Sequence, residues 1–285
     1  MNWKKDLTSF FHARALRMGT SPSLEELCYA SGRDPRIWAQ PNTYEDLIAS
    51  ILEQTISKLG TSVLELGCGC GFLAQGIAPR VGEYWGVDVA AAAVRTARSL
   101  ALPNAAFTVA DGSALAFRSN TFDVAIAYDV FTNLPSFSDC REIVGELVRV
   151  VRPGGRVLVG SVPDAATEQG FIAKVREVQT DLAHRFGPVQ FDNIRATHGK
   201  STKTSILSML NGWKYRFPRN MLRGAAFQPS GPPLDQGGIS CFYFNRKEFS
   251  ALDKKLDAES YILPLHRCNP YADFRFNIVY IKSSP

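Results

Sequence analysis

The stretch V-L-E-L-G-C-G-C-G-F-L-A at residues 63–74 decides the fold. Residues 63–66 form a short apolar run typical of a strand, glycines follow at alternate positions, and a helical pattern resumes at Phe72. Glycine suits such a loop because a side chain would keep a ligand away from the backbone N–H groups at the start of the helix. The stretch therefore predicts a strand, a tight ligand-binding loop and a helix.

The residues around these glycines indicate which ligand the loop binds. The dinucleotide fingerprint G-x-G-x-x-G fails, because its third glycine, counted from Gly67, falls on Phe72. Glu65, two residues before the first glycine, would repel a pyrophosphate but attract an ammonium group. A second expected strand ends in Asp88, where an α/β nucleotide site places a carboxylate for the ribose hydroxyls. A zwitterionic amino-acid ligand therefore fits this loop better than a dinucleotide does.

Strands and helices are expected to alternate from residue 42 onward. Asn42, with Glu45 three residues later, is typical of the N-cap of an amphipathic helix that Gly60 ends. Strands are then expected at 62–66, 84–88, 105–110, 122–128, 156–162, 260–265 and 274–282, and helices at 71–78, 90–101, 138–151, 164–184 and 245–257. This alternation predicts an α/β fold with a doubly wound, mostly parallel sheet and helices on both faces.

Five motifs resemble those of class I S-adenosylmethionine-dependent methyltransferases, in the order and at the spacing of that family. They are V-L-E-L-G-C-G-C-G at 63–71, G-V-D-V at 86–89, A-D-G-S-A-L-A-F at 110–117, F-D-V-A-I-A-Y-D-V-F-T-N-L at 122–134 and L-V-R-V-V-R-P-G-G-R-V-L-V-G at 147–160. The resemblance covers residues 42–163. It implies a Rossmann-like sheet closed by an antiparallel strand at 274–282, and S-adenosyl-L-methionine as the cofactor.

The resemblance also assigns residues to the amino-acid and ribose portions of the cofactor. Gly67, Gly69 and Gly71 would let the loop approach the methionine and the ribose, and Glu65 would support the ammonium group. Asp88 would accept both ribose hydroxyls, which are charge-assisted hydrogen bonds of good geometry.

For the adenine, the resemblance implies apolar packing and two hydrogen bonds. Val89 would pack on the ring, Asp111 would accept from the exocyclic amine, and Gly112 would offer its backbone. Tyr128 would flank the methionine portion, chiefly through its backbone. The alternative for Asp111 is a turn carboxylate that caps the start of a helix.

The general base is the least defined part of the site. Many relatives have histidine where this chain has Asn133, so a mechanism that uses that imidazole is in doubt. Methyl transfer is an in-line displacement that needs a base only when the acceptor must lose a proton. His198 and His266 are the candidates for this role, although a lone histidine is more often structural. We expect no metal site, because the cysteines show no C-x-x-C spacing.

We expect four segments: a helical N-terminal extension at 1–41, the methyltransferase core at 42–184 and 239–285, and a cap insertion at 185–238. The extension has helical signals at 3–18 and again from Ser23 to Gly32. It either lies over the active site or packs on the sheet as a prop. Trp38, in the loop that follows, is a candidate ligand contact.

The cap is expected to face the acceptor. Residues 185–238 lack sustained periodicity, which is unusual for so long a run unless it folds as a cap or a binding loop. The run W-K-Y-R-F-P-R-N-M-L-R at 213–223 mixes basic and aromatic residues. We expect its charged residues to contribute to acceptor binding: Lys214, Arg216, Arg219 and Arg223.

Composition bounds the remaining choices. The 285 residues are 45% hydrophobic and 21% charged, as in an ordinary globular protein with one large, elaborated domain. No apolar run approaches the roughly 18 residues of a membrane span, and the six cysteines read as free thiols. We therefore expect a cytoplasmic protein without a membrane partner; the oligomeric state stays open.

Two function classes compete. The first is methylation of an oxygen or nitrogen on a small molecule, because V-F-T-N-L-P at 130–135 and the tail at 269–282 are similar to bacterial methyltransferases of polysaccharide and natural-product pathways. The second is a nucleic-acid-binding protein of the same fold, either an RNA methyltransferase or a non-catalytic binder, supported by the net charge of +5 and the run at 213–223. Because the net charge is so modest, we rank the nucleic-acid-binding function below methylation of a small molecule.

Overall fold

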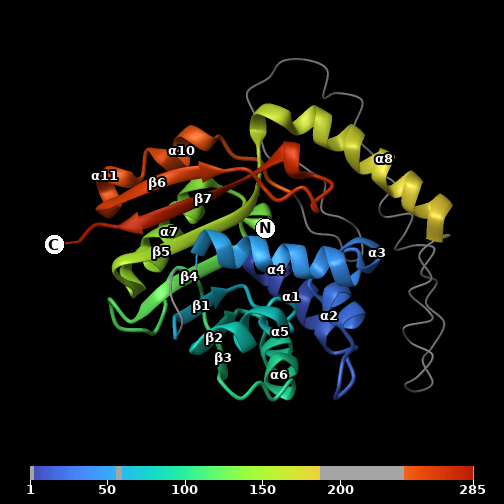
Figure 1. The fold of residues 1–285 in the computed structure, drawn as a ribbon, viewed down its shortest axis with the longest axis horizontal. Coiled ribbons are helices and arrows are strands. Elements are labelled where there is room, and N and C mark those ends of the chain that lie inside the picture. The colour runs from blue at the N-terminus through green and yellow to red at the C-terminus, as the bar shows by residue number, and fades with distance from the viewer. Residues whose placement is uncertain (1–2, 56–59, 187–240, 285) are drawn as a thin grey trace.

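The computed structural model describes residues 3–55, 60–186 and 241–284, which build on one seven-stranded sheet in the order β3-β2-β1-β4-β5-β7-β6 (Figure 1). The strands are β1 Ser62–Leu66, β2 Glu83–Asp88, β3 Ala105–Val109, β4 Phe122–Tyr128, β5 Val151–Pro163, β6 Ala258–Leu263 and β7 Arg275–Lys282. Strands β1 to β5 pair in parallel, whereas β7 is antiparallel to both β5 and β6. The predicted α/β fold with an antiparallel closing strand is confirmed.

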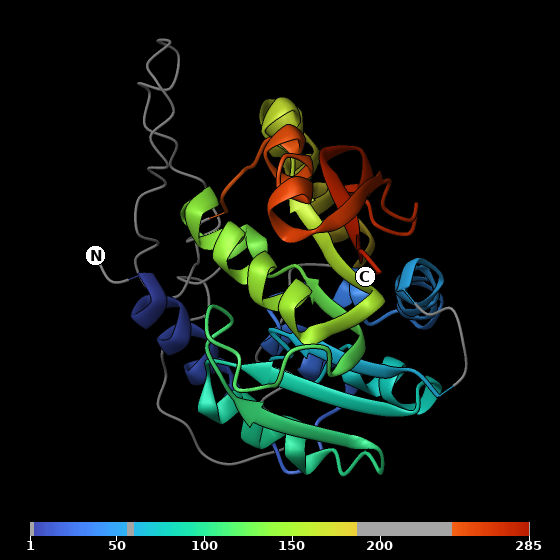
Figure 2. The same ribbon diagram turned by 90° about the vertical axis from the view of Figure 1, so that its left-hand side faces the viewer.

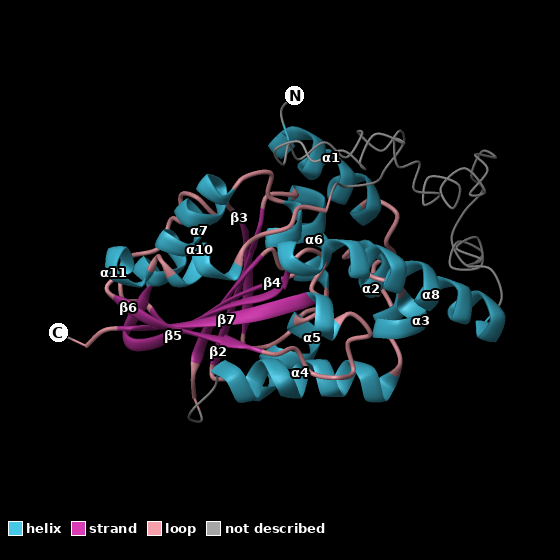
Figure 3. Ribbon diagram, turned by 90° about the horizontal axis from the view of Figure 1, so that it is seen from above, coloured by secondary structure: helices cyan, strands magenta, loops and turns pink. Residues whose placement is uncertain are grey.

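Helices cover both faces of this sheet (Figure 3). They are α1 Trp3–Ala15, α2 Leu24–Ala30, α3 Pro35–Trp38, α4 Pro41–Thr55, α5 Ala74–Ile77, α6 Ala91–Ser99, α7 Phe137–Val150, α8 Glu168–Phe186, α10 Arg246–Ser250 and α11 Asp253–Leu256. One hydrophobic cluster joins the sheet to α4, α5 and α6, and a second joins it to α7 and α10. The central strands are apolar on both faces because both faces are covered, and Figure 2 shows how the sheet twists from the cyan strands to the red ones.

Two helix starts predicted in the first half of the chain are wrong. Helix α4 already includes Pro41, whose fixed φ suits a first helical turn, so Asn42 lies inside the helix and does not cap it. Helix α5 starts at Ala74 and not at 71, because Gly71 has φ +92°, a left-handed conformation that no helix continues through. The glycine loop is therefore longer than the sequence suggested.

Boundaries in the second half also differ from the prediction. Helix α8 begins at Glu168 rather than at 164, after a 3-10 turn at Ala165–Thr167, and β6 spans Ala258–Leu263 rather than 260–265. Strand β5 begins at Val151 rather than at 156, because Val151 pairs with Phe122 before the register shifts. The expected helix at 245–257 is divided into α10 and α11. A capping box of Asn245 and Glu248 starts α10 as predicted, but the N–H of Leu252 bonds to the carbonyl of Phe249, an i to i−3 contact that tightens the chain between the two helices.

Most of the predicted cap lies outside the described residues. This holds for residues 187–238, and therefore for His198 and for the basic residues of the 213–223 run. Within the described ranges, no helix is both long enough and apolar enough to cross a membrane.

Candidate active site

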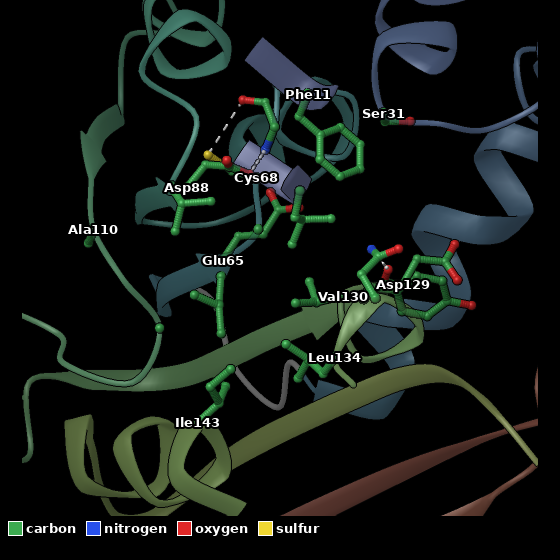
Figure 4. A pocket seen from close by; sticks show the side chains of 18 of the residues that line it. Phe11, Ser31, Glu65, Cys68, Asp88, Ala110, Asp129, Val130, Leu134 and Ile143 are labelled. Atoms are coloured by element: carbon green, nitrogen blue, oxygen red, sulfur yellow. Dashed lines mark hydrogen bonds between the residues drawn. The ribbon is translucent and has the colours of Figure 1, made fainter. Parts of the chain in front are cut away.

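A cavity opens at the carboxyl ends of β1, β2 and β4, on the edge of the sheet where α/β proteins bind ligands. Eight of the nine predicted cofactor-binding residues line it: Glu65, Gly67, Gly69, Asp88, Val89, Asp111, Gly112 and Tyr128. Figure 4 shows Glu65 lying between Asp88 on one side and Asp129 on the other. Residues from separate strands thus meet at one place.

The glycine loop is fixed to the neighbouring strand. The N–H groups of Gly67 and Cys68 both donate to the carbonyl of Val87, at 2.8 and 3.1 Å. At Gly69, which has φ +51°, an added Cβ would meet no described atom within 4 Å, so the backbone there is open to a ligand. Gly71 does not line the cavity, since an added Cβ would lie 2.5 Å from Leu100, next to α6.

Asp88 closes the loop from the end of β2. Its carboxylate accepts from the N–H of Gly69 at 2.9 Å and from that of Ala90 at 2.8 Å. Burial raises the pKa of Asp88, and these backbone donors oppose that shift. Each carboxylate oxygen has about two lone-pair sites, so both retain capacity to accept from a ligand hydroxyl.

Glu65 is a buried carboxyl at the floor of the cavity. Its side chain is 2% exposed, and it is hydrogen-bonded to the hydroxyl of Tyr84. Burial raises the pKa of Glu65 to about 8, although the positive charge of Arg33 acts in the opposite direction. A cationic ligand group beside Glu65 would favour its ionised form.

Arg33 is a cavity residue that no sequence pattern singled out. It lines the cavity from the loop between α2 and α3, with its guanidinium over the ring of Phe72 at 5.2 Å. One terminal nitrogen donates to Ser31 Oγ at 3.0 Å, and the other pairs with Asp129 at 3.2 Å. The Nε atom is buried and has no hydrogen-bond partner among the described residues, so an acceptor from a ligand would complete it.

Asp111 combines both interpretations drawn from the sequence. It accepts from the N–H of Ser113 at 3.0 Å, as a turn carboxylate does, and it also lines the cavity. Lys4 Nζ lies 2.7 Å from its other oxygen. Burial alone would raise the pKa of Asp111, but the hydrogen bonds from Lys4 and Ser113 bring it below the ordinary value.

Helix α1 of the N-terminal extension borders the same cavity. Its side chains at positions 3, 4, 7 and 11, which share one helical face, belong to the lining: Trp3, Lys4, Leu7 and Phe11. The extension combines features of the two placements considered for it, since α1 borders the cavity while Leu27 and Cys28 of α2 belong to the hydrophobic cluster that includes the sheet. The prediction that Trp38 contacts the ligand is not supported by its place in the structure. Trp38 is a core residue, 6% exposed, and lies outside the cavity lining.

Of the two histidine candidates for the general base, His198 lies outside the described residues. His266 lies outside the cavity lining, and its Nδ1 accepts from the N–H of Cys268 at 3.3 Å. A third polar residue of interest, Asn133, does line the cavity. Across the described part of the chain, no group of three or more His, Cys, Asp or Glu side chains is placed to hold a metal ion.

Comparisons with known proteins agree with this geometry. The family model for a methyltransferase domain matches residues 63–155. The 2-methyl-6-phytyl-1,4-hydroquinone methyltransferase of Synechocystis is 35% identical over 103 residues, which cover 35% of this chain and 31% of that protein. The ubiquinone biosynthesis O-methyltransferase of Leptothrix cholodnii is 30% identical over 117 residues, covering 39% and 48%. The chain thus spans less than half the length of these two relatives.

Solved structures share the fold over more of the chain. A methyltransferase dependent on S-adenosylmethionine from Methanosarcina mazei has a TM-score of 0.50 at 17% identity, covering 82% of this chain and 98% of that one. The magnesium protoporphyrin IX methyltransferase of Synechocystis, solved with bound S-adenosylhomocysteine, has a TM-score of 0.52 at 13% identity, covering 87% and 86%. At such identities the likeness concerns the fold alone.

Fold and site together define a Rossmann-like α/β protein that has a ligand cavity at the carboxyl ends of its parallel strands. The match of residues 63–155 to a methyltransferase domain narrows this class further. Residues 63–155 form a methyltransferase domain, and the fold around them is that of the class I S-adenosylmethionine-dependent methyltransferases.

Proposed function

We propose that this protein binds S-adenosyl-L-methionine in the cavity and transfers its methyl group to an oxygen or nitrogen of a small-molecule acceptor. The observation that carries the proposal is the set of polar groups in this one cavity. Asp111, Asp88, Glu65 and Arg33 each suit a different part of that cofactor. The match to a methyltransferase domain supports S-adenosyl-L-methionine as the donor.

The residues present fit the cofactor. Asp88 would accept from the ribose hydroxyls, and Asp111, beside Val89, would accept from the adenine amine. Glu65 would face the ammonium group. The carboxylate of the cofactor's methionine portion would accept a hydrogen bond from the buried Nε of Arg33, which lacks a partner among the described residues. Gly69 leaves room for this ligand to approach the backbone.

When bound, S-adenosyl-L-methionine supplies an electrophilic methyl group on a sulfonium centre. The protein's own part is to hold the donor and the acceptor in line and to exclude water, and such positioning supplies much of the acceleration in displacement reactions. The apolar side chains of α1, among them Leu7 and Phe11, border the cavity and favour an enclosed site.

A small-molecule acceptor is also supported by the relatives, whose names are those of a hydroquinone methyltransferase and an O-methyltransferase of ubiquinone biosynthesis. A sugar or a natural-product intermediate is the acceptor that the sequence resemblance favours. A nucleic-acid acceptor ranks lower, because the basic side chains that line the cavity are already paired with carboxylates and are not free for phosphates. Lys4 pairs with Asp111, and Arg33 pairs with Asp129.

Calorimetric titration tests the cofactor assignment. The wild-type protein should bind S-adenosyl-L-methionine and ignore NAD. Asp88→Ala removes the charged partner of the ribose hydroxyls and should weaken binding about tenfold to a hundredfold. Binding of NAD but not of S-adenosyl-L-methionine by the wild type would overturn the proposal. An Asp88→Ala variant with wild-type affinity would overturn only the ribose assignment.

A further inference from the structure

The carboxylates of the cavity follow the order of the strands. In the sheet order β3-β2-β1-β4, Asp111 follows β3, Asp88 ends β2, the glycine loop follows β1, and Asp129 follows β4. In the proposed binding mode Asp111 holds adenine, Asp88 holds ribose, and the loop holds the methionine portion. Asp129 lies one strand beyond, on the side away from adenine, and the cofactor assignment leaves it without a role.

Asp129 is held firmly in place. Its backbone has φ +62°, a left-handed conformation that is uncommon outside glycine and that clusters at functional sites. Arg275 of β7 donates to its Oδ1 at 2.7 Å, and Arg33 pairs with its Oδ2 at 3.2 Å. Arg275 is itself fixed, since it also donates to the carbonyl and the hydroxyl of Ser161, at 2.9 and 3.1 Å.

Val130, the residue after Asp129, packs against the glycine loop and so brings Asp129 close to it. Val130 packs so closely on Gly67 that a Cβ added there would lie 2.4 Å from its Cγ2. The Asp129 side chain lines the cavity and is 24% exposed, so it is open to a ligand. With one arginine on each oxygen, lone-pair sites remain on both for a further donor.

We propose that Asp129 accepts a hydrogen bond from the hydroxyl or amine of the acceptor that receives the methyl group. This inference rests on the proposed function and narrows it to acceptors that carry an O–H or N–H at the attacking atom. The two arginines keep the carboxylate oriented toward the cavity. His198 and His266 would not be needed to orient the acceptor.

The test compares two cofactor analogues, so it needs no knowledge of the acceptor. Sinefungin carries a primary ammonium group where S-adenosyl-L-methionine has its transferable methyl, whereas S-adenosylhomocysteine has no substituent there. An ammonium group at that place should meet the Asp129 carboxylate as an acceptor's N–H would. Calorimetry on Asp129→Asn should therefore show sinefungin binding weakened about tenfold to a hundredfold, with S-adenosylhomocysteine changed by less than about threefold.

Controls separate this role from a structural one. Asp123→Asn makes the same charge change at the other end of β4, where Asp123 pairs with Arg152 at 3.1 Å, and it should leave both affinities unchanged. Asp129→Glu keeps the charge and should retain most of the sinefungin binding. If Asp129→Asn leaves its arginines unpaired and does not fold, the double variant Asp129→Asn with Arg275→Met relieves one of them and should show the same selective loss.

Equal weakening of both analogues, or no change in either, would overturn the inference and leave Asp129 as a structural ion-pair residue. Failure of the wild type to bind S-adenosylhomocysteine is a separate result, because it would refute the proposed function itself.

Discussion

Glu65 is a carboxyl that the fold buries at an energetic cost. It lies at the end of β1 beside Tyr84, 2% exposed, and burial raises its pKa from the ordinary 4.5 to about 8. The folded protein therefore binds a proton at Glu65 more tightly than the unfolded chain does. The contribution of Glu65 to stability is thus most favourable below about pH 4.5 and declines as the pH rises toward 8.

Glu65→Gln should remove this pH dependence. The free energy of unfolding of the wild type, relative to the variant, should fall between pH 5 and 8 by up to about 1.4 kcal/mol per pH unit. Denaturant unfolding at several pH values measures the difference. Parallel pH profiles for the two proteins would mean that Glu65 is already ionised in the folded state.

Substitution of Arg33 should weaken binding of ligands that carry the amino-acid portion of the cofactor and leave binding of the adenosine portion nearly unchanged. Arg33→Gln removes the proposed partner of the carboxylate, so S-adenosylhomocysteine should bind about tenfold to a hundredfold more weakly. By contrast, 5′-methylthioadenosine lacks the amino-acid portion and should change by less than about threefold. Arg36→Gln is the matched control, because Arg36 pairs with Asp34 at 2.7 Å and lies outside this cavity. An equal loss for both ligands would remove Arg33 from the carboxylate site.

Helix α1 borders the cavity through one face, and Lys4 of this face forms an ion pair with Asp111 on the adenine side. Both side chains are more than 40% exposed, at 44% and 42%, so solvent screens the pair. Such exposed pairs contribute about 0–1 kcal/mol.

Lys4→Met should therefore change the free energy of unfolding by less than about 1 kcal/mol. Since it also frees one oxygen of Asp111 for the adenine amine, S-adenosylhomocysteine should bind at least as tightly as to the wild type. Denaturant unfolding and calorimetry measure the two effects. A tenfold loss of affinity would instead indicate that Lys4 itself contacts the ligand.

The elements that sequence patterns predicted best are those buried on both faces. Strand β4 is apolar from Val124 to Ala127, and its predicted range, 122–128, matches the structure. The start of β5 could not be predicted in the same way, because Val151 joins the sheet through its pairing with Phe122, a long-range contact. The start of α5 depended on the φ of Gly71, which sequence periodicity does not encode.

In the whole molecule, the part of the site built from one continuous motif was predictable and the part built from distant segments was not. Glu65, Gly67 and Asp88 follow a local pattern at strand ends. Arg33 comes from a loop without periodicity, and Arg275 meets Asp129 across 146 positions of sequence. Only the folded sheet brings these charges together, so no pattern in the sequence singled them out.

The topology also explains why one cavity receives groups from the N-terminal extension and the core, while the closing strand reaches Asp129. The order β3-β2-β1-β4-β5-β7-β6 puts β1 and β4 at the centre, where α1 and the loop before α3 can reach their carboxyl ends. The antiparallel β7 begins beside the end of β5, as the pairing of Arg275 with Pro163 shows. Arg275 therefore reaches Asp129 from the closing strand, whereas Arg33 reaches it from the loop between α2 and α3.

The most direct test of the account is a crystal structure of the protein with S-adenosylhomocysteine. We expect the ribose on Asp88, the adenine between Val89 and Asp111, the carboxylate on Arg33, and the sulfur facing the side of the cavity that holds Asp129. A ligand in the reverse orientation, with its adenine beside Asp129, or one bound outside this cavity, would contradict the account.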